Sequence, residues 1–309
     1  MSLYLITGGA GFIGSHIADE LVRQGQMVRI LDNFCTGTKN NLKNILNKVE
    51  IVKGDIRNEK DVNIALKKVD FVFHEAALRS VPRSVADPIS SNDVNVSGTL
   101  LLLNLSKEHK VKKFIYASSS SVYGDNPALP KVETQLPAPV SPYAVSKLTG
   151  EYYCRVFSKL FGLDTVSLRY FNVFGPRQDP KSQYAVVIPK FINAGLKGEI
   201  AEVHGDGKQS RDFSYIDNVV NANILAAKSS IKCEVINVAC GKNFSLLQAI
   251  KIIEKTTGNK MKIHHAPSRQ GDVKHTLADI SKAKKLLNYK VQVKFEEGMI
   301  KTIEHLKSL

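Results

Sequence analysis

Residues 6–16 read ITGGAGFIGSH, and their glycines fit two phosphate-binding spacings at once. The spacings G-x-G-x-x-G and G-x-x-G-x-x-G overlap here, and together they use Gly8, Gly9, Gly11 and Gly14. Glycine at such positions lets the backbone approach a pyrophosphate, and a helix that begins there points its first N–H groups at the anion. Because glycine patterns also occur by chance, the flanking residues decide what this one means.

The residues on either side supply that context. The apolar run Leu3–Thr7 predicts a buried strand before the glycines, and apolar residues recur at helical spacing after them as far as Gly25. A second apolar run, 27–31, predicts another strand and leads directly into Asp32. This order of strand, glycine turn, helix, strand and acid predicts a dinucleotide-binding unit.

Asp32 indicates which dinucleotide binds. It lies 18 residues beyond Gly14, where a carboxylate binds the hydroxyl groups of the adenosine ribose. The same carboxylate repels a 2′-phosphate, and no arginine adjoins it to reverse that preference, since Asn33 follows. The sequence therefore predicts NAD rather than NADP.

Composition narrows the class of protein. The 309 residues are enough for one elaborated domain or two, and 43% of them are hydrophobic, as in an ordinary globular protein. No apolar run approaches membrane-spanning length and the first strand leaves no room for a signal peptide, so we expect a cytoplasmic protein without a membrane partner. The four cysteines have no C-x-x-C spacing and the adjacent His264 and His265 make a poor ligand pair, so no metal is expected.

The net charge of +14 raises the alternative of nucleic-acid binding. The lysines are nevertheless spread along the chain, and no basic stripe with interleaved aromatic residues is visible. We interpret the charge mainly as solvated surface, with some attraction for anionic substrates, and expect no nucleic-acid partner.

Strands and helices continue to alternate along the first half of the chain. Further strands are predicted at 49–52, 70–74, 113–117 and 164–170, and helices at 59–68, 91–109 and 143–161. Six strands alternating with helices predict an α/β fold, a doubly wound parallel (Rossmann) sheet. Ligands of such sheets bind at the carboxyl ends of strands, where the glycine turn, Asp55, the loop HEAALRSVPRS and SSSSVYGD would gather.

The pattern changes after about residue 171, where prolines and glycines interrupt it. A smaller mixed α/β lobe is predicted there, although VINVAC (235–240) reads as one more strand of the main sheet. We therefore assign residues 1–170, with about 212–240, to the NAD-binding domain. Residues 171–211 and 241–309 are assigned to a substrate-binding lobe.

Tyr143 and Lys147 in SPYAVSK are the strongest candidates for chemistry. Their i, i+4 spacing places them one above the other on a helix face. A free tyrosine has a pKa of about 10, but a nearby ammonium and a positive nicotinamide ring favour the phenolate. The pair would then accept a proton from a sugar hydroxyl, and the serine-rich strand end at 118–121 precedes it in the expected order.

Over nearly its whole length the chain resembles the extended short-chain dehydrogenase/reductases, and more closely the UDP-hexose 4-epimerases. Within that family it is most similar to the bacterial and archaeal UDP-N-acetylglucosamine 4-epimerases. The matching pieces are TGGAGFIGS, LDNF, GDIR, HEAALRSVPRS, NVSGTL, SSSSVYGD, SPYAVSK, LRYFNVFGPRQDP, YAVVIPKFI, GDGKQSRDFSYI and RQGDVKHTLADISKA.

The resemblance implies a role for each matching residue. Ser119 would hydrogen-bond the sugar's 4-hydroxyl, with Tyr143 as the base and Lys147 as its partner. NAD contacts are implied for these three and for Gly8, Gly11, Phe12, Ile13, Gly14, Asp32, Asn33, Asp55, Ile56, Ala76, Leu78, Asn95 and Phe171. Substrate contacts are implied for the same serine and tyrosine and for Arg83, Ser120, Ser121, Asn172, Val187, His204, Arg211, Arg269, Asp272 and Thr276.

Several of these assignments leave alternatives open. Arg83 would lie near the sugar or form a structural ion pair, whereas Arg211 and Arg269 suit a diphosphate because guanidinium groups bind phosphate bidentately. Thr276 matches a gate beside carbon 2 of the sugar, where a small residue leaves room for an N-acetyl group; otherwise it merely packs at a strand edge.

The expected activity is interconversion of UDP-N-acetylglucosamine and UDP-N-acetylgalactosamine through a 4-keto intermediate. UDP-glucose/UDP-galactose and UDP-glucuronate 4-epimerases are the alternatives. A nucleotide-sugar dehydratase or a decarboxylase is disfavoured, because the strand-end motif has serines in place of an acid pair until Asp125. The intact Ser119, Tyr143 and Lys147 speak against a non-catalytic nucleotide-binding protein. A homodimer is expected through the helices near 91–109 and 143–161, since the first is apolar on more than one face.

Overall fold

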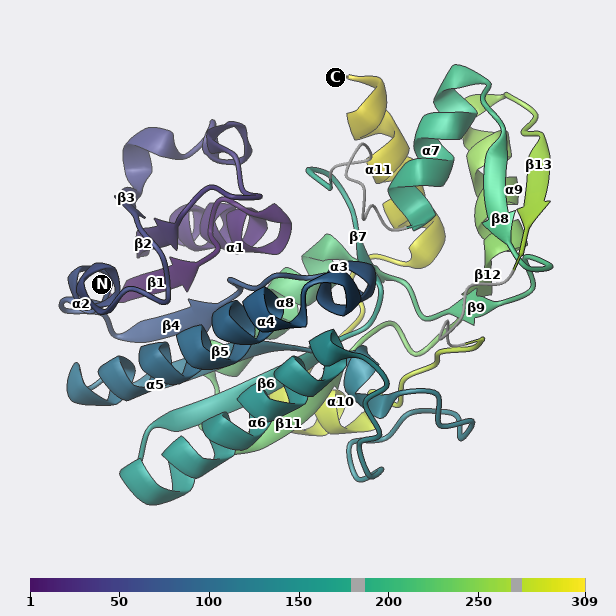
Figure 1. The fold of residues 1–309 in the computed structure, drawn as a ribbon. Coiled ribbons are helices and arrows are strands. Elements are labelled where there is room, and N and C mark those ends of the chain that lie inside the picture. Colours follow the sequence, from purple (N-terminus) through teal and green to yellow (C-terminus); the bar gives the residue numbers. More distant parts are fainter. Residues whose placement is uncertain (179–186, 268–273, 309) are drawn as a thin grey trace.

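A computed structural model describes residues 1–178, 187–267 and 274–308, and its centre is a sheet of seven parallel strands (Figure 1). The strand order is β3-β2-β1-β4-β5-β6-β11, and every neighbouring pair is parallel. The strands are β1 (Leu3–Thr7), β2 (Met27–Asp32), β3 (Glu50–Lys53), β4 (Phe71–His74), β5 (Lys113–Ser119), β6 (Asp164–Tyr170) and β11 (Glu234–Val238). The order reverses between β1 and β4, so the predicted doubly wound sheet is confirmed, with β11 as the additional strand.

Helices cover both faces of this sheet. On one face α1 contacts α8, and on the other α5 contacts both α2 and α6, with α5 and α6 side by side in Figure 1. The bounds are α1 (Phe12–Arg23), α2 (Glu59–Leu66), α5 (Gly98–Glu108), α6 (Pro142–Phe161) and α8 (Ile216–Lys228), with short 3₁₀ turns η1 (Lys39–Leu42), η2 (Leu46–Lys48) and η4 (Ser120–Tyr123). Within the described residues, no helix combines the length and the apolar character that crossing a bilayer requires.

Helix α6 illustrates how local sequence fixes an element. The Ser141 hydroxyl caps its first turn by accepting a hydrogen bond from the Ala144 N–H at 3.2 Å, and Pro142 occupies the first turn, where its missing N–H is harmless. Gly162 ends the helix in a left-handed conformation with φ of 71°. These signals explain why the predicted helix 143–161 differs from the observed one by a single residue.

Two predictions between β4 and β5 need correction. The segment HEAALRSVPRS is not loop throughout, because α3 (Val81–Ala86) begins after Ser80, whose hydroxyl accepts a hydrogen bond from the Arg83 N–H at 3.2 Å. The predicted single helix 91–109 is instead α4 (Pro88–Asn92), the π-helical turn η3 (Asp93–Ser97) and then α5. The π turn carries the buried Asn95, whose side chain binds the backbone of Leu78.

Most of the remaining elements form a C-terminal group on the right of Figure 1, built on short pairs of strands. Helix α10 (Ser281–Leu287) is the exception, because it contacts β11 and α8 of the main sheet domain. Its pairs are β7 with β10, β9 with β12, and β8 with β13, and α9 contacts both α7 and α11. The bounds are β7 (Val173–Phe174), α7 (Val187–Lys197), β8 (Ala201–His204), β9 (Ser210–Arg211), β10 (Ser214–Tyr215), β12 (Phe244–Ser245), α9 (Leu246–Thr257), β13 (Ile263–Ala266), α10 (Ser281–Leu287) and α11 (Phe295–Lys307). The division of the chain into two functional domains stays a prediction.

Candidate active site

The glycine turn lies between β1 and α1, at the carboxyl edge of the sheet. Gly8 has φ of +67°, and a Cβ there would come within 2.7 Å of the Ala76 nitrogen; a Cβ on Gly14 would come within 2.4 Å of the Gly8 oxygen. Gly11 is the residue before α1, and no side chain caps this end of the helix. The first N–H groups of α1 are therefore available to bind an anion. The close approach of the turn and the uncapped helix fit the pyrophosphate of a dinucleotide.

Asp32 ends β2 beside this turn. Its buried carboxylate accepts hydrogen bonds from the N–H groups of Ala10 and Phe34, at 2.9 and 2.8 Å. Burial raises the pKa of Asp32, while these two hydrogen bonds oppose the rise. A carboxylate held in this way retains lone pairs for the hydroxyl groups of a ribose.

Asp55, a second acid predicted to contact the cofactor, follows the carboxyl end of β3, and its carboxylate is already hydrogen-bonded within the protein. Its carboxylate accepts hydrogen bonds from the Arg57 guanidinium at 2.9 Å and from the Asn33 amide at 2.9 Å. Arg57 is the main reason that the pKa of Asp55 is lowered. Asp55 and Asn33, both predicted to contact NAD, are thus bonded to each other, and the adjacent Ile56 is buried.

Asn95 holds the loop after β4 in place. Its amide oxygen accepts a hydrogen bond from the Leu78 N–H at 2.8 Å, and its amide nitrogen donates to the Leu78 oxygen at 3.1 Å and to the Ser146 hydroxyl at 3.1 Å. Asn95 therefore joins this loop to α6, and the same loop carries Ala76 beside Gly8. Phe171, another predicted cofactor contact, is fully buried after β6 and lies 6.1 Å from the ring of Tyr123.

The structure brings together the three residues predicted to be catalytic. Ser119 ends β5, and its side chain lies close enough to Tyr143, on the first turn of α6, to act on the pKa of that tyrosine. The Ser121 hydroxyl donates to the Ser119 hydroxyl at 2.9 Å, and the Ser121 N–H is 3.2 Å from it. Burial raises the pKa of Tyr143, and the Ser119 hydrogen bond and the charge of Arg79 oppose that rise. The neighbouring Ser120 opens η4.

Lys147 lies one turn further along α6 and is buried. Its ammonium donates to the Ala117 oxygen at 2.7 Å and lies 5.0 Å from the centre of the Tyr116 ring. Burial lowers the pKa of Lys147 to about 8, and the negative charges of Glu75 and Glu151 oppose the fall. Lys147 thus lies one helical turn from Tyr143, and its ammonium is held by the last residues of β5.

Glu75 and Arg79 are two residues of this site that the sequence analysis did not single out. Glu75 directly follows β4, and its charge acts on both Tyr143 and Lys147; Arg79 also acts on Tyr143. Burial raises the pKa of Glu75 to about 7. A charged residue immediately after a predicted strand was the available signal, because ligands collect at that edge.

On the substrate side, Asn172 and Thr276 meet although 104 positions separate them in the chain. The Asn172 amide donates to the Thr276 hydroxyl at 3.2 Å, and that hydroxyl also accepts from the Asp212 N–H at 3.2 Å. Asn172 has φ of 36°, a conformation that non-glycine residues seldom adopt and that is over-represented at functional sites. The segment predicted to gate the sugar is thereby joined to the end of β6.

The other predicted substrate residues are more dispersed. Arg211 on β9 donates to the Lys274 oxygen at 3.0 Å, and Val187 opens α7. The His204 ring, at the end of β8, lies 3.0 Å from the Glu202 carboxylate and 3.0 Å from the Pro267 oxygen. Arg83 on α3 is half-buried, and its charge contributes to the lowered pKa of Asp87. Arg269 and Asp272 lie outside the described residues.

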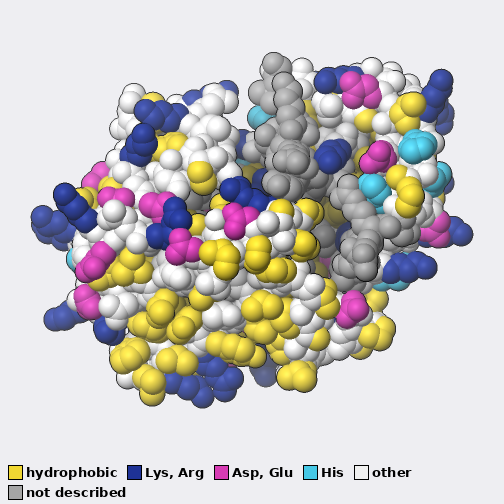
Figure 2. Space-filling view, viewed as in Figure 1, with side chains coloured by type: hydrophobic (Ala, Val, Ile, Leu, Met, Phe, Trp, Pro, Cys, Tyr) yellow, Lys and Arg dark blue, Asp and Glu magenta, His cyan; other side chains and the backbone are white. Residues whose placement is uncertain are grey.

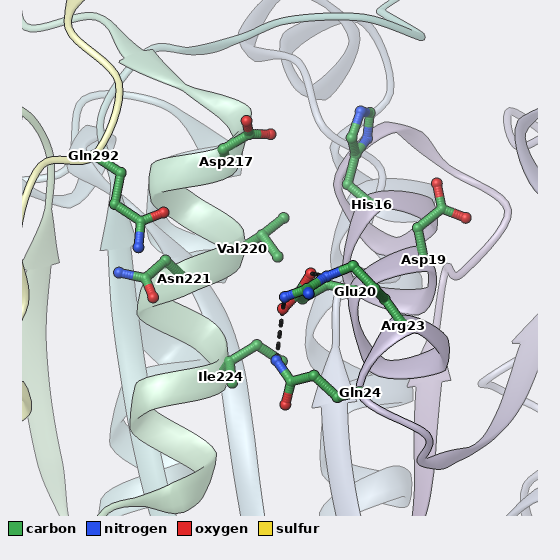
Figure 3. Close-up of a pocket in the computed structure, with 10 residues that line it drawn as sticks. All are labelled: His16, Asp19, Glu20, Arg23, Gln24, Asp217, Val220, Asn221, Ile224 and Gln292. Carbon is green, nitrogen blue, oxygen red and sulfur yellow. Dashed lines mark hydrogen bonds and ion pairs between the residues drawn. The ribbon is translucent and has the colours of Figure 1, made fainter.

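A separate cavity of about 470 Å³ opens between α1 and α8 (Figure 3). Its lining includes His16, Asp19 and Asp217 and none of the residues predicted for the site. Burial and the charge of Arg177 lower the pKa of His16 to about 4. Across the described ranges, no three His, Cys, Asp or Glu side chains are grouped in a way that would hold a metal ion.

The chain is similar to a known protein family and to several solved structures. Residues 4–239 match the model of the NAD dependent epimerase/dehydratase family. The chain is similar to a UDP-N-acetylglucosamine 4-epimerase from Methanobrevibacter ruminantium in complex with UDP-N-acetylmuramic acid, with 44% identity, coverage of 99% of this chain and 98% of the other, and a TM-score of 0.95.

Two further solved structures carry other sugars. The UDP-glucose 4-epimerase from Thermotoga maritima, with UDP-glucose, is 37% identical, with 99% of each chain covered and a TM-score of 0.95. The UDP-glucuronic acid 4-epimerase from Bacillus cereus, with UDP-glucuronic acid and NAD, is 35% identical, with 99% of each chain covered and a TM-score of 0.92. The three relatives thus share a reaction at carbon 4 and differ in the sugar named.

Proposed function

Because this chain belongs to the NAD-dependent epimerase/dehydratase family, uses NAD and is an isomerase of the UDP-sugar 4-epimerase type, we propose that it interconverts UDP-N-acetylglucosamine and UDP-N-acetylgalactosamine. The observation that carries the proposal is the group of Ser119, Tyr143 and Lys147 at the sheet edge, with Thr276 tied to the same edge through Asn172.

In this proposal Tyr143 moves the proton. Its phenolate, favoured by the Lys147 ammonium, accepts the proton of the sugar's 4-hydroxyl, which Ser119 orients, and later returns it. Bound NAD would supply the hydride chemistry at carbon 4. Because inversion at carbon 4 requires the sugar to present its other face, the protein must hold UDP firmly and the sugar loosely.

The residues expected on the diphosphate side are suited to binding UDP more firmly than the sugar. Arg211, with Arg269, Asn172 and Asp272, would hold the diphosphate, while Val187 and His204 would lie near the uridine and Arg83 near the sugar. We further propose that residues 1–170 with about 212–240 bind NAD and that the rest of the chain binds the substrate. The sugar ring would then turn between the two lobes while its diphosphate stays in place.

Thr276 supports the N-acetylated sugars over the plain ones. It is small and half-buried, and its hydroxyl accepts hydrogen bonds from the Asn172 amide and from the Asp212 N–H. A small residue beside carbon 2 leaves space for an N-acetyl group, whereas a tyrosine would fill it. UDP-glucose and UDP-galactose would be poorer substrates.

The decisive experiment is incubation of the purified protein with separate UDP-sugars, including N-acetylated, plain and acidic hexoses, followed by NMR detection of the 4-epimer. We expect the fastest conversion with the N-acetylated pair. Fastest conversion of UDP-glucuronic acid or UDP-glucose would replace the proposed substrate and leave the reaction type standing. Conversion of none, with release of a dehydrated sugar, would contradict the reaction itself.

We also propose a homodimer formed through α5 and α6. In Figure 2 hydrophobic side chains gather over the area that α4, α5 and α6 occupy in Figure 1. The exposed apolar residues of α6 include Val156, Leu160 and Phe161, which are 42%, 72% and 50% exposed. An apolar helix face of this kind is typical of an isologous interface. Light scattering at micromolar protein should give twice the chain mass of 34.1 kDa, and Leu160→Asp should lower it to the monomer.

A further inference from the structure

A buried ion pair lies behind the candidate catalytic residues. Glu151 lies one turn beyond Lys147 on α6, and Arg169 lies near the end of β6. The Arg169 guanidinium donates to both carboxylate oxygens of Glu151, from Nε to Oε1 at 2.8 Å and from Nη2 to Oε2 at 2.7 Å. The side chains of Arg169 and Glu151 are 4% and 3% exposed. The pair is therefore bidentate and shielded from water, although neither residue is among those predicted to contact NAD or the substrate.

Ser118 joins this ion pair to the end of β5. Its buried hydroxyl donates to Oε1 of Glu151 at 2.5 Å, a length typical of a hydrogen bond to a charged oxygen. The backbone oxygen of the preceding residue, Ala117, accepts a hydrogen bond from the Lys147 ammonium at 2.7 Å. Two successive turns of α6 are thus bonded to two successive residues of β5, and the next residue along that strand is Ser119.

Arg169 also contacts the other end of the serine-rich segment. Its guanidinium carbon lies 4.7 Å from the centre of the Tyr123 ring, within the range of a cation–π contact. Tyr123 closes η4, and its hydroxyl donates to the amide oxygen of the fully buried Asn237 on β11 at 2.7 Å. The ion pair therefore holds the segment 118–123 at both ends, through a hydroxyl at one end and a ring at the other, with Ser119 between them.

Stability alone is a weak reason for a chain to keep such an ion pair. Two charges lose much of their hydration when they are buried, so apolar side chains of similar volume often give an equally stable or a more stable fold. An apolar pair would, however, supply neither an acceptor for the Ser118 hydroxyl nor a cation for the Tyr123 ring. The two features that an apolar pair lacks are those that bear on the segment carrying Ser119.

We propose that Glu151 is a positioning residue: its carboxylate, acting through Ser118, fixes the end of β5 against α6 and so sets the position of the Ser119 hydroxyl. The proposal rests on the roles given above to Ser119 and Tyr143. Because these two residues come from different elements, a bond between β5 and α6 beside them sets their relative position. A displacement of about 1 Å at a reacting group lowers a rate by about 100-fold, so a strong bond at this point has a large effect on catalysis.

Ser118→Ala tests the proposal with the smallest change, because it removes the bond to Glu151 and leaves the ion pair intact. We expect kcat to fall by about 10–100-fold and KM to change little, since UDP binding does not involve this strand end. Rates are expressed per UDP-binding site, counted by calorimetry, so that unfolded protein does not contribute. Ser118→Thr keeps the hydroxyl and should retain most of the wild-type kcat.

The matched control is Ser106→Ala on α5. This serine is also buried, but its hydroxyl has no hydrogen-bond partner among the residues that the structure describes. Its removal should leave kcat per UDP-binding site at the wild-type value. An equal fall of kcat in Ser106→Ala and Ser118→Ala would show that any lost buried hydroxyl disturbs the enzyme, and it would overturn the proposal.

A double-mutant cycle separates positioning from a general disturbance of the fold. If Ser118 acts through Ser119, its removal has no further effect once the Ser119 hydroxyl is gone. Ser118→Ala in the Ser119→Ala background should therefore leave kcat within about twofold of Ser119→Ala alone. Multiplication of the two single losses would show that Ser118 acts by another route and would overturn the proposal.

The ion pair itself is tested by Glu151→Met combined with Arg169→Met, which removes both charges and keeps long side chains. The fold should persist, because no lone charge is left buried, and thermal unfolding followed by circular dichroism checks this. The kcat should fall at least as far as in Ser118→Ala, and adding Ser118→Ala should lower it no further. Wild-type kcat in the methionine pair would overturn the proposal. If the methionine pair does not fold, Ser118→Ala and its cycle decide alone.

The proposed function fails separately. Wild-type kcat in Ser119→Ala or in Tyr143→Phe would remove the roles on which this proposal depends. If both of those variants are slow while Ser118→Ala keeps the wild-type kcat, only the role of Glu151 is lost, and its ion pair remains an anchor of the fold.

Discussion

Two carboxyl groups in different regions of this molecule have their pKa values raised to about 7 by burial, yet their surroundings are opposite. Glu75, at the sheet edge, accepts a hydrogen bond from the Tyr170 hydroxyl at 2.8 Å and interacts electrostatically with Lys147 and Tyr143. Asp212, in the C-terminal group, accepts hydrogen bonds from the backbone N–H groups of Cys240, Gly241 and Ala278, at 2.9, 3.0 and 3.2 Å.

This difference distinguishes a carboxyl group at a candidate catalytic site from one that supports the fold. A raised pKa alone does not tell the two apart, because structural networks shift pKa values as strongly as active sites do. At the sheet edge the neighbours can exchange or stabilise a proton, whereas around Asp212 they join three chain segments, including the one that carries Thr276. The partners of a buried acid therefore tell more than the shift itself.

The largest effect should come from Tyr143, at the sheet edge. Tyr143→Phe removes the proton acceptor and keeps the ring, so kcat should fall by roughly 10²–10⁴-fold while UDP-sugar binding, measured by calorimetry, persists. The matched control is Tyr152→Phe on the same helix, where the side chain is 53% exposed and activity should remain. Normal turnover by Tyr143→Phe would show that another residue is the base. The contrast between a catalytic sheet edge and a structural Asp212 would then no longer hold.

Like Asp212, Asp32 accepts hydrogen bonds from backbone N–H groups. It therefore tests whether a carboxylate with such partners can still bind a cofactor. The protein should purify with NAD or NADH bound, and Asp32→Ala should weaken NAD binding by about 10–100-fold, because it removes a charged acceptor and leaves two N–H groups unpaired. Nucleotide content after denaturation measures this, with Asp32→Asn as the milder variant. Full activity only with added NADP would refute the NAD assignment.

Asp212 should affect the pH dependence of the free energy of unfolding and leave the pH dependence of kcat unchanged. Its folded pKa of about 7 lies above its ordinary value of 3.8, so the folded state holds the proton more tightly and the free energy of unfolding falls as pH rises between these values. The unfolding equilibrium constant should rise by up to about tenfold per pH unit there. In Asp212→Asn this component should vanish from denaturant titrations; parallel slopes in the two proteins would contradict it.

The smallest effect concerns the choice of sugar. Thr276→Tyr should lower the rate for N-acetylated sugars relative to plain hexoses by about tenfold, since a narrower site rejects the larger ligand first. Thr276→Ser keeps the hydroxyl that Asn172 and the Asp212 N–H engage, and it should keep the preference. Equal losses for both sugars in Thr276→Tyr would show that this segment supports the fold without selecting the substrate.

The long elements of the fold were predictable because their signals are local. Strands β1 and β6 match the predicted ranges at both ends, and α6 carries its own cap, proline and terminal glycine. The gathering of the glycine turn, Asp32 and Ser119 at one edge follows from parallel topology alone.

Other features depend on contacts that no local pattern encodes. The π turn η3 follows from the pairing of Asn95 with Leu78, and the partners of Asp212 come from segments 28 to 66 positions away. For Glu75 the sequence shows an acid after a strand, but neither its burial nor its contact with Tyr170. The site roles taken from the resemblance stay predictions that the variants above will decide.

The π turn η3 also determines how the continuous helix formed by α4, η3 and α5 tolerates the deletion of a single residue. A π turn holds one residue more than an α-helical register allows, as if a single codon had been inserted into an ordinary helix. Deleting one codon within 93–97 would let the helix close regularly, so α5 should keep its packing while Asn95 loses the bulged position from which it binds Leu78. The fold should therefore survive such a deletion, whereas the loop after β4 should be loosened. The same deletion two turns later, in α5, would instead rotate the residues beyond it by about 100° and should unfold that helix. The NAD content and the thermal stability of the two variants would report the difference.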